Sequence, residues 1–529
     1  MNTFVNAIKE EQEIGATYNG AKTNTTSGSA ILDLFAAAGN RDAILGSQFD
    51  IAFAEDPKLA FRVALWARDI RTGAGERQTF RNLLLHFEKH YPDQLLKIIP
   101  VVPSIGRWDD LFIFETKQVK EAVYTLVKMV LTLDVPEYKR ARGLLAKWLP
   151  RRGAVALEIS EFLGYENTPI AVKYSKKERE EKAKQLGVSI DDIPTDTGRT
   201  VKVPSAGYRK LLVRLTKVVE QQMCAKKWDE IVFDHVPSVA AARYQKAFYK
   251  NAPERYKEYR EGLTKVKADG TTERKINAGA VYPYDVIKSV GAGLRDVAQA
   301  QWNALPNFLG DDRILPLVDV SGSMYSWSWR HVQRAKVKSN VMPIDVAVSI
   351  GLYVADKQVG PFKDAFLTFT SEPQLQKLSG DLAAKVAQAK RAPWGGSTNI
   401  AKAFSKILEL AQTHNVPAED MPKILLILSD MEFDACIDGH GRSVSAFESL
   451  VLKYEKAGYT LPKVIFWNIN GRADNAPVRQ HESGAALVSG FSPSIFKAVL
   501  KADLENYTPY NVMLQTLANP LYDIEGLTT

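Results

Sequence analysis

The sequence has few cysteines and no long apolar segment. Its 529 residues include two cysteines, Cys224 and Cys436, too few for a disulfide scaffold or an all-cysteine metal site. No stretch approaches the ~18 consecutive apolar residues that a membrane span needs. The first residues lack the basic and apolar regions of a secretory signal. These absences favour a reduced, cytoplasmic protein that does not enter a membrane.

Several sequence patterns of enzymes are also absent. No Gly-Lys dipeptide occurs in the chain, which excludes a Walker A phosphate loop. There is no G-x-S-x-G motif, and the order HFEKH at residues 86–90 is not the H-E-x-x-H of zinc proteases. Nothing in the sequence assembles a general acid, a base and a nucleophile. We therefore expect a binding protein rather than an enzyme.

Positive charge is concentrated in the first part of the chain. Residues 1–310 hold 47 Lys and Arg against 38 Asp and Glu, whereas residues 311–529 hold 22 against 23. Residues 199–250 are the most basic, with 11 basic and 4 acidic side chains. Such a surface attracts polyanions, usually nucleic acid. The alternative is a helical surface that is merely solvated.

Two predicted helices carry this basic character. In the first, the basic residues fall largely outside an apolar stripe of leucines and valines. In the second, they follow i, i+3, i+7 spacing and share one face. The candidate RNA contacts are Arg209, Lys210, Arg214 and Lys217 on the first helix, and Arg243, Lys246 and Lys250 on the second.

The pattern of apolar residues changes near residue 310. Residues 1–310 form short helical stretches with short connections, which is typical of a helical-repeat array. Residues 173–203 interrupt this array with what we expect to be a protruding helix and loop. Residues 311–529 alternate apolar strands with helices, which predicts a doubly wound, Rossmann-like α/β sheet. The sequence thus indicates two domains, 1–310 and 311–529, with strands at 313–319, 365–370, 423–429, 463–468 and 486–490.

Residues suited to metal chemistry stand at the carboxyl ends of two strands. Strand 313–319 leads into the D-x-S-x-S motif of residues 319–323, and strand 423–429 leads into Asp430. A third loop, GGSTN at 395–399, opens a helix. Ligands of doubly wound sheets bind at this edge. Carboxylates and hydroxyls suit Mg²⁺, which retains several waters, so an open coordination position could accept an acidic group from a partner.

The motifs DVSGSM, GGSTNI and LSD resemble the von Willebrand factor A domain and its metal-ion-dependent adhesion site. By that resemblance, Asp319, Ser321 and Ser323 coordinate Mg²⁺, or Mn²⁺ or Ca²⁺, from the first loop. Thr398 coordinates from the second loop, and Asp430 acts from the third, directly or through water. The alternative is a strand-end turn rich in small residues that holds no metal.

The helical part is also similar to a known module. TTSGSAILDLF, RDIRTGAGERQTFRNLL and PSIGRWDDL look like the TROVE module, which accompanies a von Willebrand A domain in the Ro autoantigen family. The resemblance covers most of residues 25–500. It implies a monomeric ring of HEAT-like helical repeats that binds small non-coding, misfolded or single-stranded RNA. The A domain would then recruit an acidic protein ligand.

Other functions stay open at this stage. One is a protein-interaction module that assists a partner ATPase during assembly and binds no RNA, and another is a metal-dependent hydrolase. Residues 325–342 form an insertion after the metal loop that is rich in tryptophan and basic residues. Such a segment could stack bases and hold phosphates, or pack as a helical lid over the metal face.

Overall fold

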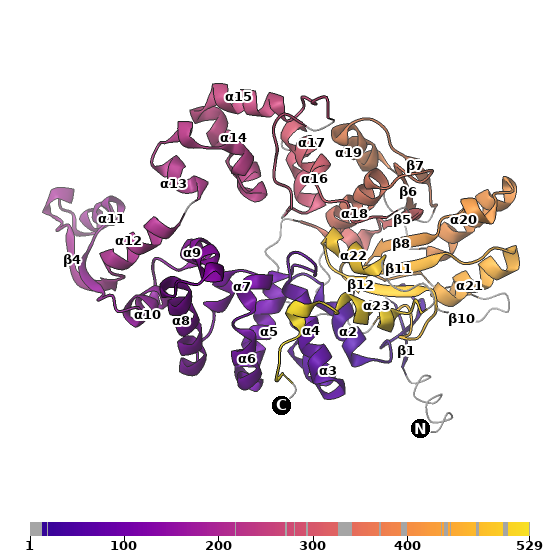
Figure 1. The fold of residues 1–529 in the computed structure, drawn as a ribbon, viewed down its shortest axis with the longest axis horizontal. Helices are drawn as coiled ribbons and strands as arrows, with labels where there is room; N and C mark the ends of the chain where they lie inside the picture. The colour runs from indigo at the N-terminus through magenta and orange to yellow at the C-terminus, as the bar shows by residue number, and fades with distance from the viewer. Residues whose placement is uncertain are drawn as a thin grey trace. The chain divides into compact units, whose positions relative to one another are not determined.

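We describe the fold from a computed structural model of the chain (Figure 1). The described residues are 13–17, 19–216, 218–269, 272–279, 281–291, 295–310, 312–325, 341–369, 372–392, 399–434, 436–437, 443–444, 446–471, 475–500 and 506–527. The chain forms two compact units. One comprises residues 1–97 and 228–529, and the other comprises residues 98–227.

The first described residues of the larger unit form a short hairpin, and helices follow it. Strands β1 (Ile14–Ala16) and β2 (Lys22–Asn24) pair antiparallel. The helices that follow are α2 (Ala30–Ala38), α3 (Gly46–Glu55), α4 (Pro57–Arg68), α5 (Arg77–His90) and α6 (Pro92–Ile98). Their starts have local causes: Ser29 accepts the backbone N–H of Leu32, and Asp56 caps α4 ahead of a proline at its first turn. A further set of helices in this unit is α14 (Ser238–Asn251), α15 (Pro253–Gly262), α16 (Pro283–Gly291) and α17 (Arg295–Asn303).

A six-stranded sheet forms the core of the larger unit (Figure 1). Its order is β12-β11-β8-β5-β6-β7, and every pairing is parallel except that of the edge strand β7. The strands are β5 (Ile314–Asp319), β6 (Ala365–Phe369), β7 (Leu375–Lys377), β8 (Ile424–Ser429), β11 (Lys463–Asn468) and β12 (Ala485–Ser489). The predicted doubly wound α/β arrangement and its five strands are therefore confirmed, and β7 was not predicted.

Helices cover both faces of this sheet. They are α18 (Pro343–Lys357), α19 (Leu382–Arg391), α20 (Ile400–Thr413), α21 (Ala446–Ala457), α22 (Phe496–Val499) and α23 (Pro509–Thr516). Phe404 of α20 and Tyr454 of α21 join the core on one face, with Leu425 and Ile427 of β8. Gly351 of α18 approaches Val318 on the other face so closely that an added Cβ would lie 2.5 Å from it. Two short strands, β9 (Cys436–Ile437) and β10 (Ser443–Val444), pair antiparallel with each other.

The smaller unit is mostly helical. It contains α7 (Val102–Ile105), α8 (Lys117–Thr132), α9 (Pro136–Trp148), α10 (Ala154–Phe162), α11 (Lys176–Leu186), α12 (Ala206–Leu215) and α13 (Val219–Cys224). The segment 173–203, predicted as a protruding helix and loop, does contain α11, but it also holds β4 (Asp196–Val203), which pairs with β3 (Thr168–Lys173) immediately before the segment. The sequence gives no sign of these strands, because most of their side chains are exposed and no apolar alternation marks them.

The first helices pack directly on the sheet. The hydroxyl of Ser489, at the end of β12, accepts the N–H of Gly39 at 3.0 Å and donates to the carbonyl of Phe35 at 3.1 Å. The α-rich and α/β parts therefore share one unit, although the apolar pattern changes near residue 310. The domain boundary predicted between residues 310 and 311 marks the change in apolar pattern. The boundaries between the two compact units lie elsewhere, after residues 97 and 227.

Gly39 offers a test of this packing. A Cβ at this position would lie 2.4 Å from the backbone carbon of Ser489, and a strand backbone cannot move aside cheaply. We expect Gly39→Ala to lower the free energy of unfolding by about 1–3 kcal/mol, the usual cost of overpacking. Urea denaturation would measure it, with Gly279→Ala as the control because nothing lies near a Cβ there. Equal stability of the two variants would contradict this description of the contact.

Candidate functional site

The candidate site lies where two central strands end. Strand β5 pairs with β8 on one side and β6 on the other, all three in parallel. The chain leaves β5 at Asp319 and β8 at Ser429, so both loops emerge at the same edge. The order of strands reverses at β5, and this is the position where doubly wound sheets bind ligands.

Asp319 is fully buried and fixed by hydrogen bonds. One carboxylate oxygen accepts the hydroxyl of Ser429 at 2.5 Å, and the other accepts the backbone N–H of Ser321 at 2.8 Å. Burial raises the pKa of Asp319 above its usual value, although both serines oppose that shift. The negative charge of Asp434 raises the pKa further. A nearby cation would therefore stabilise the ionised form of this buried carboxylate.

Asp430 is the second buried carboxyl group at this edge. Burial, followed by the charge of Asp319, raises the pKa of Asp430 to about 7. A hydrogen bond from the hydroxyl of Ser323 opposes that shift. The hydroxyls of Ser321 and Ser323 lie 3.0 Å apart, so they link the two carboxyl groups into one cluster of oxygen atoms.

The structure thus brings together four of the five predicted metal ligands. Asp319, Ser321, Ser323 and Asp430 share one edge, and Thr398 lies outside the described residues. Two carboxylates with two hydroxyls form the donor set that Mg²⁺ accepts when waters complete its octahedron. Across the described ranges, no three His, Cys, Asp or Glu side chains gather into a metal cage, so the hydroxyls are essential to this fit.

The loop after β8 has a tightly constrained backbone. Met431 adopts a left-handed conformation with φ of 65°, which is uncommon for a residue with a side chain. Its N–H donates to the Ser429 hydroxyl at 3.0 Å, and the N–H of Glu432 donates to the Asp430 carboxylate at 3.3 Å. The turn therefore holds Asp430 in the cluster.

The N-terminal hairpin reinforces that loop through contacts that the sequence did not predict. The Thr17 hydroxyl donates to the carbonyl of Phe433 at 2.5 Å, and the Asn19 amide donates to that of Glu432 at 2.6 Å. Thr23 donates to Asn475 at 2.8 Å. The partners are more than 400 positions apart in the chain, and no local pattern could have indicated the pairing.

We expect Thr17→Val to destabilise the protein by about 1–3 kcal/mol, because it removes a hydroxyl that donates to the carbonyl of Phe433 and accepts the buried N–H of Ala21 at 2.9 Å. Thr25→Val is the matched control. Its hydroxyl also donates to a backbone carbonyl, that of Glu13 at 2.9 Å, but this bond is exposed. Thermal unfolding of both variants would measure the difference. A loss in Thr17→Val no larger than in the control would show that the hairpin does not hold the loop.

The predicted RNA contacts fall on two separate units. On α12 of the smaller unit, Arg209, Lys210 and Arg214 are exposed, and Lys217 lies outside the described residues. The helix predicted there ends earlier than expected, at Leu215. On α14 of the larger unit, Arg243, Lys246 and Lys250 are exposed, while Ala241, Gln245 and Phe248 are buried on the opposite face. Each set therefore faces solvent as expected.

Two other sequence predictions concern the insertion after the metal loop and the absence of a membrane span. Of the insertion at 325–342, residues 326–340 lie outside the described residues, so its role stays a prediction. Within the described part of the chain, no helix has both the length and the apolar character to span a membrane.

Comparison with known proteins gives two family matches. Residues 17–121 and 167–312 match a domain of unknown function, DUF2828, and residues 314–515 match another, DUF7788. An uncharacterized protein of Acanthamoeba polyphaga mimivirus is 27% identical over 559 aligned positions, which cover 96% of this chain and 88% of the viral protein.

These matches correct the family prediction. The resemblance to the Ro autoantigen family, with its TROVE module and von Willebrand factor A domain, is wrong, because the matching families are the two domains of unknown function. The viral relative gives it no support either. The helical-repeat ring that the resemblance implied loses its basis. The cluster of oxygen atoms at the sheet edge and the exposed basic residues stand on the structure alone.

Proposed function

We propose that this protein is a cation-dependent binding protein. Its β5–β8 edge would hold one divalent cation, most simply Mg²⁺, with Mn²⁺ or Ca²⁺ as substitutes. The observation that carries the proposal is the pair of buried carboxyl groups, Asp319 and Asp430, which are linked by the hydroxyls of Ser321 and Ser323. The charge of Asp319 raises the pKa of Asp430. Two buried negative charges this close together are energetically unfavourable unless a positive charge lies between them.

The protein side chains would have distinct tasks at this site. Asp319 and Asp430 would supply charge, and Ser321 and Ser323 would supply neutral oxygen atoms. Ser429 orients Asp319 through its hydroxyl. A bound cation would offer a coordination position that these residues do not fill, and a carboxylate of a partner protein could complete it.

Acetate provides a simple test of this open position. With Mn²⁺ as the cation, we expect the protein to increase the relaxation rate of acetate methyl protons beyond that in free Mn²⁺ solution, since acetate would bind the protein-held ion. The increase should disappear on addition of excess Mg²⁺. Mn²⁺ binding without an effect on acetate would leave a closed metal site and exclude recruitment of an acidic ligand.

RNA binding is a second candidate function. It is supported by Arg243, Lys246 and Lys250, which are exposed together on one face of α14. A row of this kind follows a phosphate backbone without reading its sequence. The alternative is an assembly module that binds protein partners and no RNA. In that case the cation site alone would recruit the partner.

We expect Arg243→Glu combined with Lys246→Glu to weaken binding of single-stranded RNA for all sequences alike. Loss of two phosphate contacts should flatten the slope of log affinity against log salt by about 1.4. Fluorescence anisotropy at several salt concentrations would measure both effects. Lys176→Glu with Lys177→Glu is the control, because it changes the charge equally on α11, where these lysines are exposed. Equal affinity of the two double variants would mean that the α14 face is only solvated.

A further inference from the structure

The net positive charge of the chain lies entirely in the smaller unit. Residues 98–227 hold 24 Lys and Arg against 16 Asp and Glu, an excess of 8 that equals the net charge of the whole chain. The rest of the chain is balanced, with 45 basic and 45 acidic side chains. An excess of one sign attracts partners of the opposite sign. The smaller unit therefore carries the field that a polyanion would meet.

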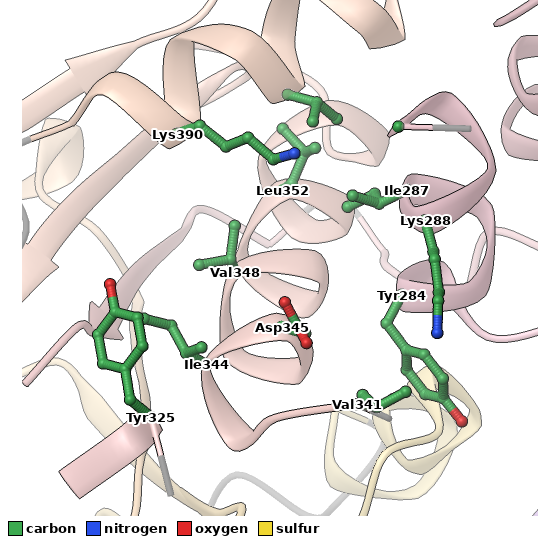
Figure 2. Close-up of a pocket in the computed structure, with 12 residues that line it drawn as sticks. Tyr284, Ile287, Lys288, Tyr325, Val341, Ile344, Asp345, Val348, Leu352 and Lys390 are labelled. Carbon is green, nitrogen blue, oxygen red and sulfur yellow. The ribbon is translucent and has the colours of Figure 1, made fainter. Parts of the chain in front are cut away.

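The cavity of the larger unit, by contrast, is bordered by charges of both signs. It has a volume of about 630 Å³ and lies between α16, α18 and α19 (Figure 2). Lys288 and Lys390 stand on opposite sides of this space, and the acidic Asp345 of α18 lines it as well. This lining favours neither an anion nor a cation.

Two segments of the smaller unit contain basic residues and no acidic ones. Residues 138–157, which include most of α9 and the start of α10, hold six Lys and Arg. Residues 197–219, which include most of β4 and all of α12, hold another six. The acidic residues of the unit lie outside these segments, where some pair with lysines, as Glu121 does with Lys117 at 3.7 Å. The excess charge is therefore concentrated in two stretches of chain.

These two segments pack against each other. The hydroxyl of Tyr208 on α12 donates to the carbonyl of Pro150, just after α9, at 3.0 Å. The guanidinium of Arg151 donates to the hydroxyl of Thr216, at the end of α12, at 3.3 Å. The turn after α9 thus runs along α12, and the basic residues of both segments gather in one region of the unit.

Four basic side chains of these segments are exposed, and we call them the α9–α12 face: Arg152, Arg209, Lys210 and Arg214. Lys210 and Arg214 are about one helical turn apart on α12, roughly 6 Å along its axis. Within the described part of the chain, no ion pair neutralises any of the four. A bound polyanion would relieve the repulsion among these cations.

The α9–α12 face offers cations without aromatic side chains beside them. The ring of Trp148, the last residue of α9, is covered by the Arg107 guanidinium, 3.7 Å from its centroid, and Tyr208 is buried. Among the described residues of α9, α12 and the turn after α9, no aromatic side chain is exposed. Proteins that hold single strands add aromatic side chains on which the bases stack. In a duplex the bases stack on each other and the phosphates face outward, so cations alone suffice.

We infer that the α9–α12 face binds the phosphate backbone of double-stranded nucleic acid, either RNA or DNA. Contacts of this kind position a duplex without reading its sequence. Neither family match assigns a ligand to this face. The inference depends neither on the cation site nor on the α14 face proposed for single-stranded RNA.

Fluorescence anisotropy with labelled duplexes of about 20 base pairs tests the inference. The full-length protein should bind a duplex and its scrambled counterpart equally well, and duplex RNA and duplex DNA measured separately identify the preferred form. In Arg243→Glu with Lys246→Glu, which alters the α14 face, duplex affinity should stay within about twofold of the parent, and a single strand of equal length should bind at least about tenfold more weakly than the duplex. Absence of duplex binding by the parent, or equal affinity of this variant for both forms, would overturn the inference.

A second pair of substitutions locates the duplex on the unit. Lys210→Glu with Arg214→Glu should weaken duplex binding by about tenfold or more and flatten the slope of log affinity against log salt by about 1.8. Lys176→Glu with Lys177→Glu makes the same charge change on α11 of the same unit and should bind the duplex within about twofold of the parent. Circular dichroism would show that both variants are folded. Unchanged duplex affinity in the folded α12 variant, or an equal loss in the α11 control, would refute the site.

Discussion

Replacement of Asp319 with asparagine is expected to abolish cation binding and to raise stability in the absence of metal. Asparagine keeps the shape of the side chain and can still bond to Ser429 and Ser321, which hold Asp319 at 2.5 and 2.8 Å. It removes one of the two buried charges at the edge of the sheet. Because buried ionic groups are often costly, the metal-free variant should gain about 1–3 kcal/mol.

In the parent protein, bound metal should raise the free energy of unfolding. At a Mg²⁺ concentration of about 100 times the dissociation constant, binding should stabilise the parent by about 2.7 kcal/mol and leave Asp319→Asn unchanged. Thermal unfolding with Mg²⁺ and with EDTA would show both effects. Asp420→Asn is the control, since this exposed aspartate precedes the opposite end of β8. A Mg²⁺ response in Asp319→Asn equal to that of the parent would place the cation elsewhere.

Removal of Glu76 should be the most destabilising single substitution considered. Glu76 is 3% exposed and forms a double hydrogen bond with Arg41, with atoms 3.1 and 3.2 Å apart. Burial lowers the pKa of the Arg41 guanidinium, but the charge of Glu76 outweighs this effect, so Arg41 stays protonated. Glu76→Ala would leave the largely buried guanidinium of Arg41 without its carboxylate partner, 4.4 Å above the ring of Phe491. We expect a loss of about 3–5 kcal/mol.

Two further variants, measured by urea denaturation, show whether this loss of stability comes from the unpaired charge. Arg41→Met with Glu76→Leu should recover part of the stability, because the double variant removes both members of the Arg41–Glu76 pair, although the buried Arg68 then loses the nearby charge of Glu76. Lys139→Ala breaks an exposed pair, Lys139 with Asp134 at 3.0 Å, and should cost less than about 1 kcal/mol. A double variant as unstable as Glu76→Ala would show that packing, and not charge, explains the effect.

The sheet was largely predictable because its strands are buried on both faces. Residues of β5 and β8 are all buried, so each strand appears in the sequence as a short continuous apolar run between helices. The edge strand β7 has largely exposed residues and left no such pattern. The same reason hid the β3–β4 hairpin, which has an almost entirely exposed surface.

The candidate site was predictable only in part. Neighbouring parallel strands end at the same edge of a sheet. That rule alone places Asp319 and Asp430 together, although they are 111 positions apart in the sequence. The contact between Thr17 and the loop after β8 follows no such rule, because it depends on how distant segments pack. The cavity beside α18 also needs three helices in place before its charged and apolar groups meet.

The family resemblance failed for a related reason. Motifs such as DVSGSM consist of small polar residues that many strand ends require, since the chain must turn tightly and satisfy backbone groups there. They indicate the local geometry well, and the Asp319 loop has the expected turn. They carry much less information about ancestry, and the family matches decide that question differently.

Titration of Mn²⁺ into the full-length protein, followed by electron paramagnetic resonance, tests the central proposal most directly. Free Mn²⁺ gives a sharp signal that is lost when the ion binds protein, so the titration counts bound ions. We predict one saturable site per chain, displaced by Mg²⁺, and its loss in Asp319→Asn and Asp430→Asn. A free-ion signal that rises in proportion to added Mn²⁺ from the first addition, or a saturable site retained in both variants, would contradict the cation-binding function.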